Sequence, residues 1–119
     1  MSAFNLNKVT LQFTITDVST AGQTFIPIPI EFDGDIVEIR TALNGAIATA
    51  DAVLTPKING VVMTNGVITI ANSGSAAGDV DSSFPTSART VRAGDAIEIE
   101  TTGASTNTVE VTGTVVIRR

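Results

Sequence analysis

The chain has 119 residues and carries seven Lys and Arg against twelve Asp and Glu, which gives a net charge of −5. This length is typical of one domain with its own core, and the acidic balance argues against nucleic acid as a partner because phosphate contacts need clustered basic side chains. The absence of Cys, His, Trp and Tyr excludes disulfides, thiolate or imidazole metal ligands, and nucleophiles activated by histidine. We therefore expect a protein that is not an enzyme and that binds no cofactor.

Residues 1–7, MSAFNLN, precede the first regular pattern. They have neither the basic nor the apolar part of a secretory signal, and no stretch of the chain approaches the ~18 apolar residues that span a membrane. We therefore expect synthesis in the cytoplasm and no membrane contact. Phe4 and Leu6 stand at alternate positions, so this segment is either a frayed terminus or an arm that adds to a neighbouring subunit or another surface as a strand.

Apolar and polar residues alternate over residues 8–16 and again over residues 23–32. This period of two is typical of strands with one buried and one solvated face. The second segment also contains Pro27 and Pro29. Because proline cannot donate a backbone hydrogen bond, the second strand is expected at the edge of a sheet.

Asp33-Gly34 predicts a tight hairpin turn into a third strand over residues 35–43. The small, Ala-rich residues 44–52 then form a loop, because this segment is too short for an independent helix.

Two Asn-Gly pairs, Asn59-Gly60 and Asn65-Gly66, lie within residues 54–70 and are flanked by β-branched and other apolar residues. A two-residue type I′ hairpin needs positive φ at both central positions, which Asn tolerates and Gly adopts freely. The segment therefore predicts a three-stranded meander with a short middle strand.

Residues 71–85 are rich in Ala, Ser, Gly and Asp, which predicts a long exposed loop. A turn at Gly94-Asp95 then begins a strand in which Ile alternates with Glu, and Asp95 can hydrogen-bond the local backbone there. In the last strand Gly113 falls in register with the inward Val and Ile residues, which indicates a bend or a close backbone approach.

About eight strands, turn signals every 8–12 residues and no amphipathic helix predict an all-β fold, a single antiparallel β-sandwich over residues 8–119. The Cys and Trp core residues of immunoglobulin domains are missing. We therefore favour a jelly roll among the sandwiches, with the strand order left open.

An acidic cluster occupies the sequence EFDGDIVE, with Glu31, Asp33, Asp35 and Glu38. Converging carboxylates are what Ca²⁺ prefers, but the regular ligand order and terminal Glu of an EF-hand loop are absent. We interpret the cluster as a hairpin turn with solvated carboxylates and predict no metal site.

The stretches Ile36-Val37 and Val115-Val116-Ile117 place apolar residues on both faces of their strands. A small sandwich has one core, so additional apolar surface indicates that a partner covers it. The candidate partner-binding residues are Phe4, Leu6, Phe84, Val115 and Ile117.

The run DGDIVEIRTALNGAIATADAVLTPKINGVVMTNGVITIANSGSAAGDV followed by TVRAGDAIEIE resembles the decoration, or cement, proteins of tailed-bacteriophage capsids, over roughly residues 20–118. The resemblance implies a small all-β protein that binds the outside of an assembled head, commonly as a trimer where capsomers meet. We accordingly expect a homotrimer, the phage major capsid protein as its partner, and a location on the capsid surface of the virion.

The piece VRAGDAIEI also resembles the Ala-Gly-Asp turn before a late strand in C1q-like and tumour-necrosis-factor-like trimeric jelly rolls. The alternative interpretation is therefore a trimeric module at the tip of a fibre or spike that binds a host-surface glycan through residues 44–52 and 71–85. Glycan sites generally offer an aromatic platform, and Phe84 is the only aromatic residue of these two loops. We therefore favour capsid decoration.

Overall fold

The computed structural model describes residues 7–18, 25–103 and 108–119. Within these ranges the chain forms strands and no helix, and hence no helix that could span a membrane. The strands are β1 (Lys8–Ile15), β2 (Phe25–Pro29), β3 (Gly34–Leu43), β4 (Ala52–Ile58), β5 (Val61–Val62), β6 (Ile68–Ile70), β7 (Val80–Ser83), β8 (Thr90–Val91), β9 (Ala96–Gly103) and β10 (Val111–Arg118).

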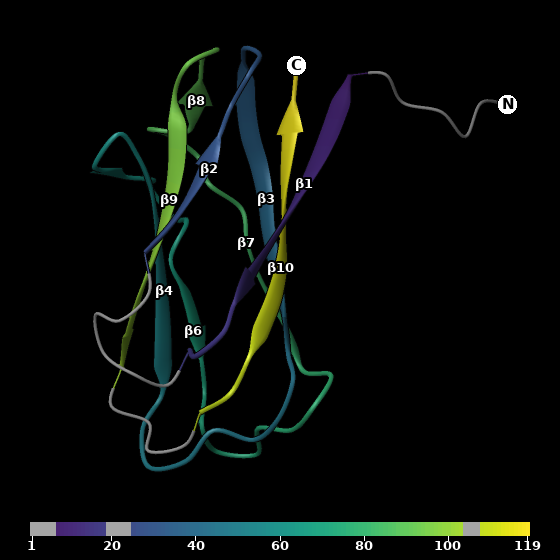
Figure 1. Ribbon diagram of the computed structural model, residues 1–119, viewed down its shortest axis with the longest axis vertical. Coiled ribbons are helices and arrows are strands. Elements are labelled where there is room, and N and C mark those ends of the chain that lie inside the picture. The colour runs from purple at the N-terminus through teal and green to yellow at the C-terminus, as the bar shows by residue number, and fades with distance from the viewer. Residues whose placement is uncertain (1–6, 19–24, 104–107) are drawn as a thin grey trace, which may run out of the picture.

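The strands form two antiparallel sheets, which confirms the β-sandwich. Sheet I has the order β1-β10-β3-β7, with β8 also paired to β3, and sheet II has the order β2-β9-β4-β5, with β6 also paired to β4. In Figure 1, β1, β3 and β10 of sheet I lie on the right and β2, β4 and β9 of sheet II lie on the left. The chain passes back and forth between the sheets, since β1, β3, β7, β8 and β10 belong to one and the others to the second.

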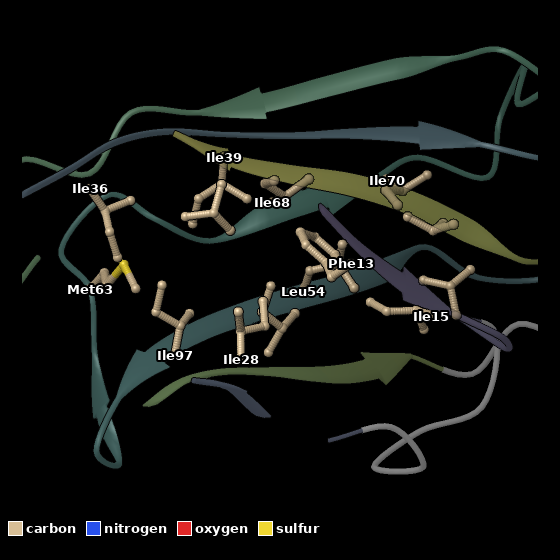
Figure 2. Close-up of a cluster of buried hydrophobic side chains, with 14 of the residues drawn as sticks. Phe13, Ile15, Ile28, Ile36, Ile39, Leu54, Met63, Ile68, Ile70 and Ile97 are labelled. Atoms are coloured by element: carbon tan, nitrogen blue, oxygen red, sulfur yellow. The ribbon is translucent and has the colours of Figure 1, made fainter. Parts of the chain in front are cut away.

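The core lies between the sheets and consists mainly of Ile and Val (Figure 2). The period-two prediction is confirmed at both ends of the chain: Ile15, Ile97 and Val111 are fully buried. The predicted close approach at Gly113 is also confirmed. Phe13 lies directly opposite Gly113 in the β1–β10 ladder, and its ring occupies the space that a side chain at residue 113 would need.

The prediction of an edge position for the proline-containing strand is confirmed, because β2 pairs with β9 alone among the described strands. The predicted hairpin at Asp33-Gly34 is wrong, because β2 belongs to sheet II and β3 to sheet I. Directly after β2, Ile30 is hydrogen-bonded to the turn at residues 94–95 that precedes β9. Ile30 N donates to Asp95 O at 2.9 Å, and Gly94 N donates to Ile30 O at 2.8 Å. Residues 33–34 therefore connect the two sheets.

The predicted meander over residues 54–70 is also wrong in its pairing. The turn at Asn59-Gly60 has positive φ at both residues, 50° and 86°, and joins β4 to β5 as expected. However, β6 pairs with β4 as well, at the opposite end of that strand. The segment between β5 and β6 is too short to add a strand, and it instead inserts Met63 into the core at 1% exposure.

The predicted long loop over residues 71–85 is interrupted by β7, which pairs with residues 39–42 of β3. The remaining loop covers residues 71–79. The other predicted loop is confirmed, since no strand is present between Leu43 and Ala52.

Candidate partner-binding surface

The outer face of sheet I is nearly uncharged at its centre, although the chain is acidic. Alternation with the buried residues of each strand directs these side chains outward. We call this set the neutral face; it comprises Gln12 and Thr14 on β1, Thr112 and Thr114 on β10, Ala42 on β3, and Val80 and Ser82 on β7. Arg40 lies among them, and its guanidinium donates to Glu38 Oε2 at 2.8 Å.

The neutral face is hollowed at its centre. The hollow has a volume of about 330 Å³. Its outward-facing lining side chains are Gln12, Thr14, Arg40, Ala42, Val80, Thr112 and Thr114. Hydroxyl, amide and methyl groups thus form a concave surface that a partner can contact without removing water from an unpaired charge.

Two large apolar side chains are exposed on the β7 side of this face. Val80 is 58% exposed and Phe84 is 60% exposed. Val80 lies opposite Ala42 and Ser82 lies opposite Arg40 in the ladder with β3, and the alternation of the chain places Phe84, two residues beyond Ser82, on the same side. The predicted partner-binding residue Phe84 therefore lies beside the neutral face.

The outer face of sheet II has a different character. Glu98 and Glu100 on β9 and Lys57 on β4 alternate with buried residues there. Lys57 Nζ lies 3.7 Å from Glu100 Oε1, and Glu98 Oε1 accepts a hydrogen bond from Gly60 N at 2.8 Å. Such exposed ion pairs contribute little to stability, but they keep the centre of this face charged and hydrated. Exposed apolar side chains are present at its β5 edge as well, where Val62, 44% exposed, pairs with Lys57.

The other predicted partner-binding residues have different positions. Phe4 and Leu6 lie outside the described residues. Val115 and Ile117 are 0% exposed, so the assignment of a partner-binding role to them is corrected here to a role in the chain's own core. On β3 a bulge opposite Val116 and Ile117 explains the consecutive apolar residues Ile36 and Val37, because it turns Ile36 fully inward and leaves Val37 half-buried.

The acidic cluster of residues 31–38 does not converge on one point. Asp33 Oδ1 accepts from Ala93 N at 3.0 Å, and Asp35 Oδ1 accepts from Thr90 Oγ1 at 2.7 Å. Among the residues that the structure describes, no group of three or more Asp, Glu, Cys or His side chains could hold a metal ion. These carboxylates instead connect residues 33–35 to the segment around β8.

The predicted loops 44–52 and 71–85 are partly brought together, at the lower end in Figure 1. We call residues 44–51 and 71–79 the loop cluster. Ser75 Oγ accepts from Ile47 N at 3.0 Å, and Asn72 N donates to Asp51 Oδ1 at 2.9 Å. Phe84 follows β7 and does not belong to this cluster.

A second cluster of hydrogen bonds joins the turns at residues 59–60 and 94–95. Asn59 Nδ2 donates to Asp95 Oδ1 at 3.0 Å, and Arg92 N donates to Asp95 Oδ2 at 2.9 Å. These hydrogen bonds lower the pKa of the Asp95 carboxyl. The predicted hydrogen bond between Asp95 and the local backbone is confirmed: the carboxylate accepts from Arg92 N, and this contact fixes the start of β9.

A scan against protein-family models and a search of curated proteins give no match to this chain. Val80 and the neutral face were not predictable from surplus apolar residues, because Val80 is the only apolar residue of β7 and the face is mainly polar but uncharged. The signal that could have revealed them is the row of uncharged outward positions in the first and last strands, such as Gln12, Thr14, Thr112 and Thr114.

Proposed function

We propose that this chain is a non-enzymatic structural protein of a phage virion that binds the outside of the capsid and stabilises it. The observation that carries the proposal is the neutral face, with its hollow and the exposed Phe84 and Val80 beside it. Depletion of charge with retention of apolar and aromatic groups is typical of the central part of a protein interface. The acidic face of sheet II fits the surface that remains in water and keeps a densely decorated particle soluble.

The proposal includes a homotrimer with the phage major capsid protein as its partner. The repeated crossing of the chain between the two sheets, as from β1 to β2 to β3 to β4 and from β8 to β9 to β10, supports a jelly-roll topology, the fold class that the resemblance implies. A ligand that binds only the assembled lattice stabilises it by RT ln(1 + [L]/Kd). A trimer would contact the lattice at three equivalent points, so contacts that are individually weak would add through avidity.

Residues 1–7 are proposed as an arm that adds to these contacts through Phe4 and Leu6. Deletion of residues 2–7 tests this part of the proposal by itself. Loss of capsid binding with an unchanged unfolding midpoint is the expected result, and undiminished binding would remove the arm from the proposal.

The alternative is a fibre-tip or spike-tip module that binds a host-surface glycan through the loop cluster. The hydrogen bonds between the loops, such as that from Ile47 N to Ser75 Oγ, favour it because they hold both loops as one surface. The described part of the loop cluster contains no aromatic side chain, which makes this alternative the weaker one. Binding to a glycan array that is lost on Ser75→Ala would favour the glycan module over decoration.

The test combines light scattering after size exclusion with co-sedimentation on undecorated capsids. Phe84→Ser changes a side chain that is 60% exposed beside the neutral face, and Val61→Ser changes one that is 59% exposed on β5 of sheet II. Thr112→Lys introduces a charge into the neutral face, and Thr69→Lys introduces the same charge at an exposed strand position of sheet II. We expect the wild-type chain to sediment with capsids as a trimer.

Phe84→Ser and Thr112→Lys are expected to reduce capsid binding or trimer formation, while their matched controls behave as the wild type. A wild-type monomer that does not sediment with capsids would refute the proposal. Equal losses in all four variants would refute the assignment of the neutral face, because the binding surface would then lie elsewhere.

A further inference from the structure

The sequence contains three Asn-Gly pairs, at residues 44–45, 59–60 and 65–66. Asn is a labile residue in proteins, and it is most labile before Gly, because no side chain hinders attack of the following backbone nitrogen on the Asn carboxamide. The Asn is exposed in all three pairs. Local sequence and exposure therefore make the three pairs similar, and any difference between them must come from the fold.

The pair at residues 59–60 is held by hydrogen bonds on both reacting groups. Asn59 Nδ2 donates to Asp95 Oδ1 at 3.0 Å, and Asn59 Oδ1 accepts from Ala96 N at 3.4 Å. Gly60 N donates to Glu98 Oε1 at 2.8 Å. The adjacent carboxylate also disfavours loss of the Gly60 amide proton, because it would face the anion that results.

The pair at residues 65–66 is held by hydrogen bonds and by crowding. Asn65 Nδ2 donates to Thr86 Oγ1 at 3.0 Å, and Gly66 N donates to Met63 O at 3.2 Å. Gly66 is buried, and a carbon atom added to its Cα would lie 3.0 Å from both Met63 Cβ and Pro56 Cγ. The backbone at Gly66 therefore has little room to move toward the carboxamide.

The pair at residues 44–45 has neither restraint. The backbone N of Asn44 donates to Glu110 O at 3.0 Å, which fixes the chain up to this point. Beyond it, the Asn44 carboxamide and the Gly45 N–H have no hydrogen-bond partner among the described residues. A carbon atom added to Gly45 would meet only Val109 Cγ1, at 3.8 Å, so the backbone has space to rotate.

We infer that Asn44 is a covalent modification site of the folded chain, at which the carboxamide is converted spontaneously to a carboxylate with water as the co-reactant. The Gly45 nitrogen loses its proton to a solvent base and attacks Asn44 Cγ. A bond forms between these two atoms, Nδ2 takes up a proton from solvent, the bond from Cγ to Nδ2 breaks, and ammonia leaves a five-membered succinimide. Water then adds to either carbonyl and opens the ring to Asp or isoAsp, with no oxidation or reduction.

The modification alters the loop cluster in two ways. It adds one negative charge to the net charge of −5, close to the backbone of Glu110. The isoAsp product also inserts a methylene group into the main chain three residues before Ile47, whose N–H donates to Ser75 Oγ. We therefore expect the two loops to separate in the isoAsp form and not in the Asp form.

The experiment incubates the purified full chain in mildly alkaline buffer and follows each Asn-Gly peptide by mass spectrometry. Asn44 is expected to react about tenfold or more faster than Asn59 and Asn65, because three hydrogen bonds at residues 59–60 and two at residues 65–66 must first be broken. Asn44→Gln should abolish the early mass change, and its matched control Asn59→Gln should leave that change intact. In strong urea the three rates should converge.

Three results would overturn the inference. The first is reaction of Asn59 or Asn65 as fast as Asn44 in the folded chain, and the second is a folded chain in which none of the three reacts. The third is a preference for Asn44 that persists unchanged in urea, because it would show that the local sequence and not the fold selects the site.

Discussion

Replacement of Gly113 by Ala tests the packing between β1 and β10. A Cβ atom at residue 113 would lie 2.6 Å from Phe13 Cε1, 2.7 Å from Cε2 and closer still to Cζ. Carbon atoms pack best about 3.5–4.0 Å apart, so the ring would have to move by about 1 Å or leave its rotamer. Three ring atoms are involved, and Phe13 is only 6% exposed, so the ring cannot move into solvent without disturbing the side chains that pack around it.

Overpacking of a core typically costs about 1–3 kcal/mol, and the number of close atoms places this substitution near the upper end. Ala is intrinsically better than Gly in a strand by about 0.5–1 kcal/mol, which offsets part of the cost. We therefore expect Gly113→Ala to lower the free energy of unfolding by about 2 kcal/mol.

The assay is urea unfolding followed by far-UV circular dichroism, because the chain has no Trp or Tyr for a strong fluorescence signal. Gly45→Ala is the matched control, since the nearest atom to its new Cβ is Val109 Cγ1 at 3.8 Å. We expect this control to change the stability by less than about 1 kcal/mol, in the stabilising direction.

A double-mutant cycle isolates the contact. In a Phe13→Leu background the cost of Gly113→Ala should fall close to zero, which corresponds to a coupling energy of about 2 kcal/mol. If the two substitutions are additive within about 0.5 kcal/mol, the reasoning is refuted, because the loss would then come from the backbone at residue 113 and not from the ring.

Further predictions concern two carboxylates and one turn. Burial and the nearby Asp79 raise the pKa of Asp81. The ionised carboxylate therefore lowers stability as the pH rises through the folded-state pKa. Asp81→Asn should raise the free energy of unfolding at neutral pH by less than about 1 kcal/mol, measured by urea unfolding. A lower free energy of unfolding in this variant would contradict the prediction. The pKa of Asp95 is instead lowered, chiefly by the hydrogen bond from Asn59. The stabilisation that the Asp95 carboxylate provides is therefore lost as the pH falls through its folded-state pKa. In Asp95→Asn, the free energy of unfolding measured against pH should fall less steeply on the acid side. Asn59→Ala should lower the unfolding free energy by about 2 kcal/mol, and more than Asn59→Gly, because Ala tolerates the φ of 50° poorly.

The strands themselves were largely predictable because their burial repeats every second residue. The sequence indicated that Phe13 and Ile15 on β1 and Ile97 and Ile99 on β9 face inward, and each is nearly or fully buried. The edge position of β2 followed from its prolines, since a missing donor excludes a central strand. These features depend on residues that are neighbours in sequence.

The partner of each strand was not predictable in the same way. A turn signal such as Asp33-Gly34 shows that the chain changes direction, but not which sheet it then joins. Hydrogen bonds between Ile30 and residues 94–95 keep the chain beside β9 of sheet II, and the next strand, β3, pairs in sheet I. Strand β7 was missed because Val80 is its only apolar residue, so it shows no period. Its position depends on the ladder with β3.

The candidate surface was predictable only in part. Phe84 was identified because a large aromatic residue in a polar segment has nothing nearby in sequence to cover it. Sequence alone places Val115 and Ile117 at a partner surface, because consecutive apolar residues exceed what one face of a strand can bury. On β10 plain alternation buries Val115 and Ile117 and leaves Val116 half-buried between them. The bulge in the β10–β3 ladder accounts for Ile36-Val37, and the position of a bulge depends on the register between two distant strands.

The difference between the two outer faces suggests how the proposed interface would balance solubility and binding. Burial of the sheet II face would require desolvation of Glu98, Glu100 and Lys57, which costs more than their exposed pairing returns. The neutral face carries mainly hydroxyl and methyl groups, and its one charge pair, Arg40 with Glu38, is already hydrogen-bonded. Contacts there can form through ordered water at low cost, and each contact would be weak. Such a surface favours partners that present many copies of the same site, as the lattice of a capsid does.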